Sequence, residues 1–178
     1  MVYTLLATGF EEIEALTVVD ILRRAEIPVK MVSVTDDLKV TGAHGIEVVA
    51  DCMLSGIEDG ELLFLPGGLP GVTNLEVCPT VIELIKEYAD AGKFVSAICA
   101  APSILGKMGL LNGRKATCYP SFEKFLDGAD YLTEKVVVDG KFITSRGAGT
   151  AADLGFKIVS LLKSKELAEK LKSGMIYD

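Results

Sequence analysis

Short apolar runs alternate along the chain with longer stretches in which apolar and polar residues follow helical spacing. The apolar runs are nearly continuous, as is typical of strands buried on both faces of a sheet. The predicted strands are Tyr3–Ala7, Val29–Val34, Gly45–Ala50, Leu62–Leu65, Phe94–Ile98, Lys135–Val138 and Phe142–Thr144. The predicted helices are Glu11–Ala25, Pro79–Ala91, Ala101–Met108, Thr150–Leu162 and Ser164–Lys172. This alternation predicts an α/β fold with a mostly parallel central sheet and helices on both faces.

Length and charge narrow the class of protein. The 178 residues fit one domain, and no Pro/Ser-rich linker, repeat or low-complexity segment divides residues 1–178. The net charge of −7 argues against a nucleic-acid or anionic-membrane partner, because both are bound through clustered Lys and Arg. The N-terminal segment has no basic region of a signal peptide, and no apolar run approaches the ~20 residues of a membrane span. We therefore expect a cytoplasmic protein.

Four cysteines and one histidine bear on redox and metal chemistry. A reducing compartment keeps such cysteines as free thiols. They are widely spaced, no C-x-x-C pair occurs, and His44 is the only histidine, so neither a metal nor another cofactor is predicted. Cys52, Cys78 and Cys118 are interpreted as small apolar residues of the core.

Cys99 is the candidate reactive residue. It directly follows the strand Phe94–Ile98, and the small residues Ala100 and Ala101 lead into Pro102, which suits the first position of a helix. Open parallel sheets bind ligands beyond the carboxyl ends of their strands, so we expect the loop Cys99–Pro102 to meet the loops Thr8–Phe10 and Pro66–Leu69 there. A helix N-terminus favours a thiolate, which predicts a pKa below the value of about 8.5 of free cysteine.

Three glutamates open the first predicted helix. Thr8-Gly-Phe-Glu11 fits a capping box, which gives Glu11 a structural role, and Glu12 is expected to be solvated. Glu14 shares a helical stripe with Val18 and Ile21, so a buried carboxyl there would stay protonated and donate a hydrogen bond. The alternative is that Glu14 lies at the margin of the stripe and reaches water.

Two glycine-containing loops supply backbone groups. Pro66-Gly-Gly68 allows close approach of the backbone to a ligand, and the N–H groups of Gly68 and Ala100 together would form an oxyanion hole. Ser145-Arg-Gly-Ala-Gly-Thr150 opens the next helix and fits an anion-binding loop or a plain N-cap turn equally well.

These motifs resemble the ThiJ/PfpI superfamily, in the branch of the parkinsonism-linked protein DJ-1 and its bacterial relatives. The resemblance rests on Glu11-Glu-Ile-Glu14, Leu65-Pro-Gly-Gly68, Ala97-Ile-Cys-Ala-Ala-Pro102 and Thr144-Ser-Arg-Gly-Ala-Gly-Thr150. It implies a flavodoxin-like sandwich, a homodimer, Cys99 as nucleophile and Glu14 as the protonated carboxyl bonded to its sulfur. It also implies Gly68 and Ala100 as oxyanion donors.

The chain departs from the family pattern near the nucleophile. Tyr119 stands where some relatives carry a histidine, and a tyrosine is a poor base at neutral pH. Ala100 replaces the histidine that follows the cysteine in the peptidase branch, which argues against a Cys-His peptidase. His44 and Arg24 match positions that place arginines near the dimer-related active site in relatives.

Three functions remain open from the sequence. The first is cofactor-free conversion of a small aldehyde such as methylglyoxal, or of a glycated substrate, through attack by Cys99 and proton transfer by Glu14. The second is an oxidative-stress sensor or chaperone in which Cys99 oxidises to a sulfinate stabilised by Glu14. The third, a cysteine peptidase or amidohydrolase, would need His44 beside the sulfur of Cys99.

Overall fold

A seven-stranded sheet forms the centre of the computed structural model, which describes residues 1–177. The strands lie in the order β10-β11-β7-β6-β1-β2-β5, and all neighbours are parallel except the hairpin of β10 with β11. Their bounds are β1 Val2–Leu6, β2 Val29–Ser33, β5 Cys52–Met53, β6 Leu62–Leu65, β7 Phe94–Ile98, β10 Val136–Asp139 and β11 Phe142–Ser145. The central strands β1 and β6 are buried along their whole length, which explains their continuous apolar sequences.

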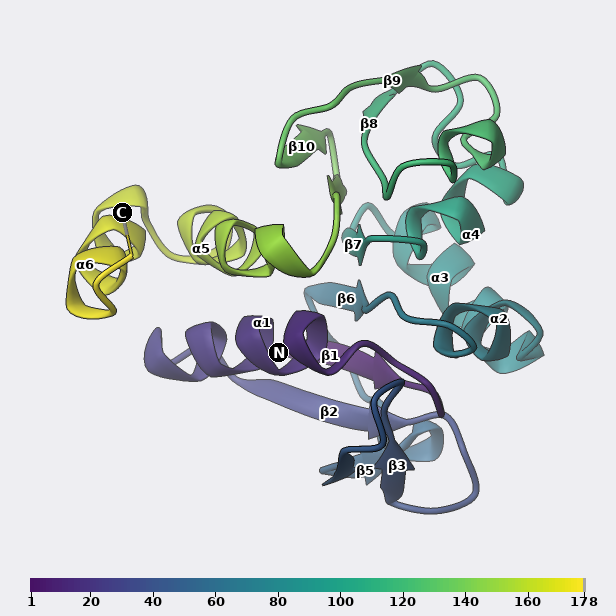
Figure 1. Cartoon of the computed structure of the whole chain (residues 1–178), viewed down its shortest axis with the longest axis horizontal. Helices are drawn as coiled ribbons and strands as arrows, with labels where there is room; N and C mark the ends of the chain where they lie inside the picture. Colours follow the sequence, from purple (N-terminus) through teal and green to yellow (C-terminus); the bar gives the residue numbers. More distant parts are fainter. Residues whose placement is uncertain (178) are drawn as a thin grey trace.

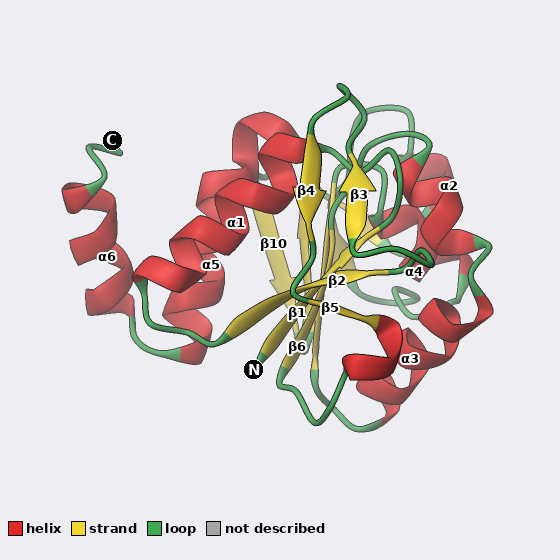
Figure 2. Cartoon of the chain, turned by 90° about the horizontal axis from the view of Figure 1, so that it is seen from below, coloured by secondary structure: helices red, strands yellow, loops and turns green. Residues whose placement is uncertain are grey.

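Helices cover both faces of this sheet (Figures 1 and 2). In Figure 2, α1 and α5 lie on one face with α6 outside them, and α2, α3 and α4 lie on the other. The bounds are α1 Glu12–Arg24, α2 Gly71–Glu76, α3 Pro79–Asp90, α4 Pro102–Lys107, α5 Ala151–Leu162 and α6 Lys165–Gly174. The predicted flavodoxin-like α/β sandwich is confirmed.

Two small two-stranded sheets complete the fold. The hairpin of β3 (Lys39–Thr41) with β4 (Glu47–Val49) includes most of the predicted strand Gly45–Ala50. The sequence pattern does not predict α2, the edge strand β5 or the pair β8 (Lys115–Ala116) with β9 (Asp130–Tyr131). These helix and strand segments are too short to show a clear apolar period in the sequence. None of the described helices has the length and apolar character needed to span a bilayer.

Candidate active site

The three loops predicted to converge do so at the carboxyl ends of β1, β6 and β7. The Glu11 N–H donates to the Gly67 carbonyl at 2.9 Å, and the Gly71 N–H donates to the Gly9 carbonyl at 3.1 Å. These bonds tie the loop after β1 to the loop after β6. The next strand in the sheet, β7, delivers Cys99 to the same place.

Cys99 occupies a sharp turn between β7 and α4. Its φ of +64° lies in the left-handed region, which costs free energy for a residue with a Cβ. The Cys99 N–H donates to the Ser145 carbonyl at 3.0 Å, and the Cys99 carbonyl accepts from the Tyr119 N–H at 2.8 Å. Neighbouring segments on both sides therefore hold the strained residue and fix the direction of its side chain.

Glu14 lies in the first turn of α1 and is only 1% exposed. One carboxyl oxygen, Oε2, accepts the Gly67 N–H at 2.8 Å, and the carboxyl lies beside the Cys99 thiol. Burial raises the pKa of Glu14 to about 7, against the opposing effect of the Gly67 N–H and the Cys99 thiol. The interpretation of Glu14 as a water-exposed side chain at the margin of the helix stripe is wrong.

Backbone N–H groups of Ala100 and Gly68 lie near the Cys99 sulfur and favour its thiolate. Gly68 has a φ of +89°, and a Cβ there would collide with the backbone of Gly9 and Glu11. A Cβ on the preceding residue, Gly67, would lie 2.6 Å from the Cβ of Cys99. The glycine pair therefore permits an approach of the backbone to the sulfur that a side chain would block.

The predicted low pKa of Cys99 is wrong in direction. Burial of the sulfur and the charge of Glu14 raise the pKa of this thiol to about 12, and the N–H groups of Ala100 and Gly68 offset only part of that increase. The prediction relied on the helix after Cys99, but α4 has six residues and begins three positions later. Its dipole is small beside a carboxyl group hydrogen-bonded to the sulfur.

A pocket of about 360 Å³ opens above Cys99. Five predicted site residues line it, which are Cys99, Glu14, Gly68, Ala100 and Tyr119. The further lining residues Glu11, Leu69, Phe122 and Ala148 were not among the predicted site residues, although Leu69 and Ala148 lie in loops that the sequence indicates for ligand binding. Burial also raises the pKa of Cys118 to about 12, so acidity does not distinguish Cys99 from Cys118. Cys99 differs from Cys118 because it lines the pocket.

Arg24 and His44 do not line this pocket. Arg24 lies in the last turn of α1, where its Nε is 2.7 Å from Asp20, far along the helix from Glu14. The His44 Nδ1 lies 2.8 Å from Glu12 and 3.6 Å from Glu11. No histidine of the described chain therefore lies beside the sulfur, and the arrangement that a Cys-His peptidase needs is missing from residues 1–177.

The other two glutamates of α1 differ from expectation. Glu11 is itself the N-cap, and its carboxylate accepts from the Ile13 N–H at 3.4 Å, so the capping box starting at Thr8 is wrong. Glu12, predicted to be solvated, is 4% exposed and accepts from the backbone N–H groups of His44 at 2.7 Å and Ile46 at 3.4 Å. Glu11, Glu12 and His44 lie close enough together to suggest a metal site, but the hydrogen bond between Glu12 and the His44 ring explains why they are close.

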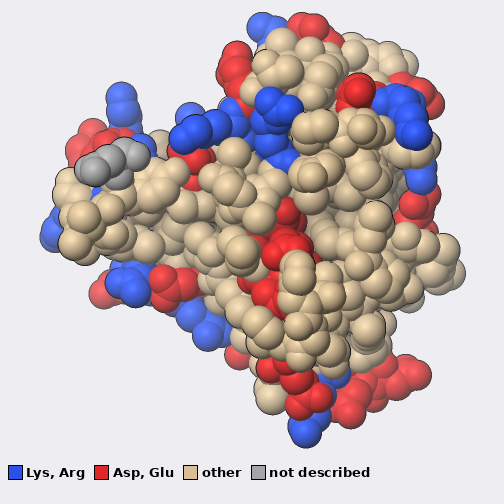
Figure 3. Space-filling model, viewed as in Figure 1, with Lys and Arg blue, Asp and Glu red and all other residues tan. Residues whose placement is uncertain are grey.

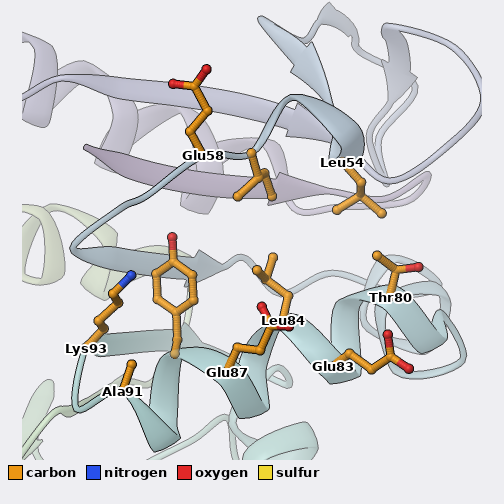
Figure 4. Close-up of a pocket in the computed structure, with 10 residues that line it drawn as sticks. Leu54, Glu58, Thr80, Glu83, Leu84, Glu87, Ala91 and Lys93 are labelled. Atoms are coloured by element: carbon orange, nitrogen blue, oxygen red, sulfur yellow. The ribbon is translucent and has the colours of Figure 1, made fainter.

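A second cavity, also of about 360 Å³, lies between α3 and the segment from Leu54 to Glu58 (Figure 4). The side chains of Glu83 and Glu87 project from α3 at its rim, and Lys93 at one end pairs with Asp59 at 2.5 Å. No cysteine or histidine lines this cavity. The cysteine chemistry that the sequence indicates therefore does not extend to this second cavity.

Comparison with known proteins agrees with this geometry. The family model described as DJ-1/PfpI family matches residues 1–161. The chain belongs to the DJ-1/PfpI family. The glutathione-independent glyoxalase DJR-1.2 of Caenorhabditis elegans, a similar protein, is 34% identical over 165 residues, which are 90% of this chain and 87% of that protein.

Two further DJ-1 proteins show the extent of the likeness. The Protein DJ-1 homolog B of Arabidopsis thaliana is 40% identical over 174 residues, 96% of this chain, and the chain spans only 40% of that protein's length. The structure of oxidised DJ-1 from Toxoplasma gondii superposes with a TM-score of 0.95 at 34% identity, covering 99% of this chain and 97% of the other.

Proposed function

We propose that this chain converts small α-oxoaldehydes such as methylglyoxal to hydroxyacids without a cofactor, with Cys99 as the nucleophile. The observation that carries the proposal is the contact of one sulfur with the Glu14 carboxyl and with the N–H groups of Gly68 and Ala100 inside a pocket. The naming of the similar Caenorhabditis elegans protein as a glutathione-independent glyoxalase supports it.

The first step follows from the position of the Glu14 carboxyl beside the Cys99 sulfur. Burial raises the pKa of Glu14 to about 7, so an ionised fraction of this carboxyl lies beside the Cys99 thiol near neutral pH. Glu14 takes the thiol proton as the sulfur attacks the aldehyde carbon and the C–S bond forms. The aldehyde oxygen becomes an oxyanion next to the N–H groups of Gly68 and Ala100, and protonation by Glu14 gives a hemithioacetal.

The second step moves a hydrogen between adjacent carbons. The Glu14 carboxylate removes the proton from C1 of the hemithioacetal, giving an enediol, and returns it to C2. C1 is thereby oxidised to a thioester while C2 is reduced to an alcohol, so no external oxidant or reductant is required. Water then hydrolyses the thioester to the hydroxyacid and restores the thiol of Cys99.

Lactate formation from methylglyoxal by the purified chain, with no glutathione present, tests this function. We expect Cys99→Ser to lose turnover by a factor of at least about 10³, because an alcohol beside a base with a pKa near 7 is a poor nucleophile. Cys78→Ser is the matched control, since Cys78 is a partly buried free thiol outside the pocket, and it should retain turnover. Full turnover by Cys99→Ser would overturn the proposal.

A second candidate function is redox sensing by the same thiol. Two equivalents of hydrogen peroxide would oxidise Cys99 to a sulfinic acid, with release of two waters. A Glu14 carboxyl with a pKa of about 7 is partly protonated near neutrality and can donate a hydrogen bond to a sulfinate. Intact mass after mild peroxide should show two added oxygens on Cys99; oxidation confined to Cys52 or Cys78 would contradict this role.

A homodimer in the cytoplasm also belongs to the proposal. Ile13, Ile46 and Val49 expose more than half of their surface around the start of α1 and the β3–β4 hairpin, at 56%, 54% and 59%. Exposed apolar side chains gathered on one region favour association. Light scattering of the wild-type protein should give a molar mass twice that of one chain. The Ile13→Glu variant should give the mass of a single chain.

A further inference from the structure

An open pocket of about 500 Å³ adjoins the Cys99 pocket. Tyr119 and Ala148 line both, so the two spaces share a wall. Thr133, Lys135 and Arg146 line the far part of the open pocket. A molecule bound at Cys99 and longer than methylglyoxal would therefore extend past Tyr119 toward these residues.

Arg146 is the unpaired cation of this open pocket. Its Nη1 donates to the Thr133 carbonyl at 3.0 Å, and within residues 1–177 its guanidinium forms no ion pair with a carboxylate. Lys135 differs, because Asp153 lies 3.3 Å from its ammonium group. The guanidinium of Arg146 thus keeps donors in a planar arrangement that matches a carboxylate or a phosphate.

The backbone that carries Arg146 is fixed relative to the nucleophile. The Thr150 hydroxyl oxygen accepts from the N–H groups of Arg146 at 3.2 Å and of Gly147 at 3.1 Å. The residue before Arg146, Ser145, accepts the Cys99 N–H at 3.0 Å. The distance between the thiol and the backbone of Arg146 is therefore set by a short hydrogen-bonded connection, and the Thr133 carbonyl holds the guanidinium at its far end.

Charge differs in sign across the two pockets. Glu11 and Glu14 line the Cys99 pocket from α1, whereas Arg146 and Lys135 line the open pocket. Figure 3 shows the same division on this face, with Asp and Glu side chains over the start of α1 and Lys and Arg side chains in the region of β10. A negative group on a substrate is repelled by the first set and attracted by the second, which orients the substrate.

We infer that Arg146 is a specificity-determining residue that binds an oxyanion at the end of the aldehyde substrate away from its reacting carbonyl. The inference rests on the proposed function and extends it, because it names the substrate class as α-oxoaldehydes that carry a carboxylate or a phosphate. The chemistry shared by a carboxylate and a phosphate is a set of anionic oxygens that accept hydrogen bonds from a guanidinium, here beside the uncharged side chains of Tyr119 and Thr133.

Labelling of Cys99 by charged and neutral maleimides tests the subsite without requiring turnover. The charged reagent is 3-maleimidopropionate and the neutral reagent is N-ethylmaleimide. Peptide mass spectrometry measures the rate at which each reagent modifies Cys99. We expect Arg146→Gln to lower the ratio of the charged to the neutral rate about tenfold, the size of one charge-assisted hydrogen bond. Lys157→Gln, an exposed lysine of α5 outside both pockets, should leave the ratio unchanged.

Turnover provides the second arm, with 4,5-dioxopentanoate and its methyl ester as the charged and neutral α-oxoaldehydes. The ratio of their kcat/KM values should fall about tenfold in Arg146→Gln and stay constant in Lys157→Gln. If both aldehydes react but neither ratio responds to Arg146→Gln, the inference fails and the proposed function stands. If neither aldehyde reacts while the maleimide ratio depends on Arg146, the proposed function fails and the oxyanion subsite stands.

Discussion

Two carboxyl groups two residues apart in the first turn of α1 are buried to almost the same degree and titrate in opposite directions. Glu12 is 4% exposed and Glu14 is 1% exposed. Burial raises the pKa of Glu12, but hydrogen bonds from the His44 ring and from backbone N–H groups outweigh this effect and lower it below its usual value. Burial dominates at Glu14 and raises its pKa to about 7.

Despite their similar exposure, Glu14 lies deeper in the protein than Glu12 and has fewer hydrogen-bond donors, and together these explain the difference in pKa. Glu12 receives N–H groups from a loop that folds over it, so its charge is solvated by the protein. Glu14 receives the Gly67 N–H on Oε2, and its Oε1 has no partner in the described chain. One carboxylate is therefore suited to hold the β3–β4 hairpin against α1, and the other to exchange a proton near neutrality.

Substitutions of Glu14 and Glu12 should differ most in their effect on catalysis. Glu14→Gln keeps an acceptor for the Gly67 N–H but cannot take the thiol proton, so we expect lactate formation to fall by a factor of about 10² to 10⁴. Glu12→Gln leaves the pocket groups in place and should change turnover by no more than a few-fold. Steady-state rates at pH 7.5 measure both, and equal losses in the two variants would remove the functional distinction.

Glu14→Gln should stabilise the folded protein even though it lowers turnover. Between pH 4.5 and about 7 folded Glu14 retains a proton that the unfolded chain has lost, so its burial destabilises the fold increasingly as pH rises through this window. At pH 8 the penalty is on the order of 3 kcal/mol, and Glu14→Gln should recover most of it. Urea unfolding at pH 8 and at pH 4.5 measures the difference, which should vanish at the lower pH. A difference independent of pH would show that the proton is not the cause.

Glu12→Gln should destabilise the protein. The neutral amide weakens the charge-assisted hydrogen bonds that the carboxylate accepts from His44 and Ile46, at a cost of about 2 kcal/mol at pH 7. Because the pKa of Glu12 is lowered in the folded state, its contribution is present above the unfolded value of 4.5 and is lost as pH falls below it. Urea unfolding should therefore show a gap from the wild type that narrows in acid; a variant as stable as the wild type at pH 7 would refute the role of Glu12.

The sequence predicted the fold far better than the environment of these carboxylates. Each central strand is a nearly continuous apolar run, and that pattern is local, so β1, β6 and β7 and the convergence of their loops could be predicted. Glu14 was recognisable because it shares a stripe with Val18 and Ile21. These are properties of residues within one or two helical turns of each other.

Contacts between distant segments could not be predicted in the same way. Glu12 is buried by His44, which lies 32 positions along the chain, and no local pattern signals that pairing. The pKa of Cys99 depends on a carboxyl group 85 positions earlier, whereas the prediction weighed only the short helix next to it. Burial of the sulfur and the nearby Glu14 carboxyl outweigh a six-residue helix, so the direction of the pKa shift required the tertiary structure.

The smallest effect concerns the acidity of the thiol. Glu14→Gln removes the charge that helps to raise the pKa of Cys99 but leaves the sulfur buried, so we expect the pKa to fall from about 12 by roughly one unit. The rate of Cys99 alkylation by iodoacetamide, followed against pH, should shift to lower pH by that amount. Glu12→Gln should leave the profile unchanged, because the Glu12 carboxylate faces His44 rather than the sulfur. An unchanged profile in Glu14→Gln would mean that burial alone keeps the thiol protonated, and Glu14 would then act on the substrate but not on the nucleophile.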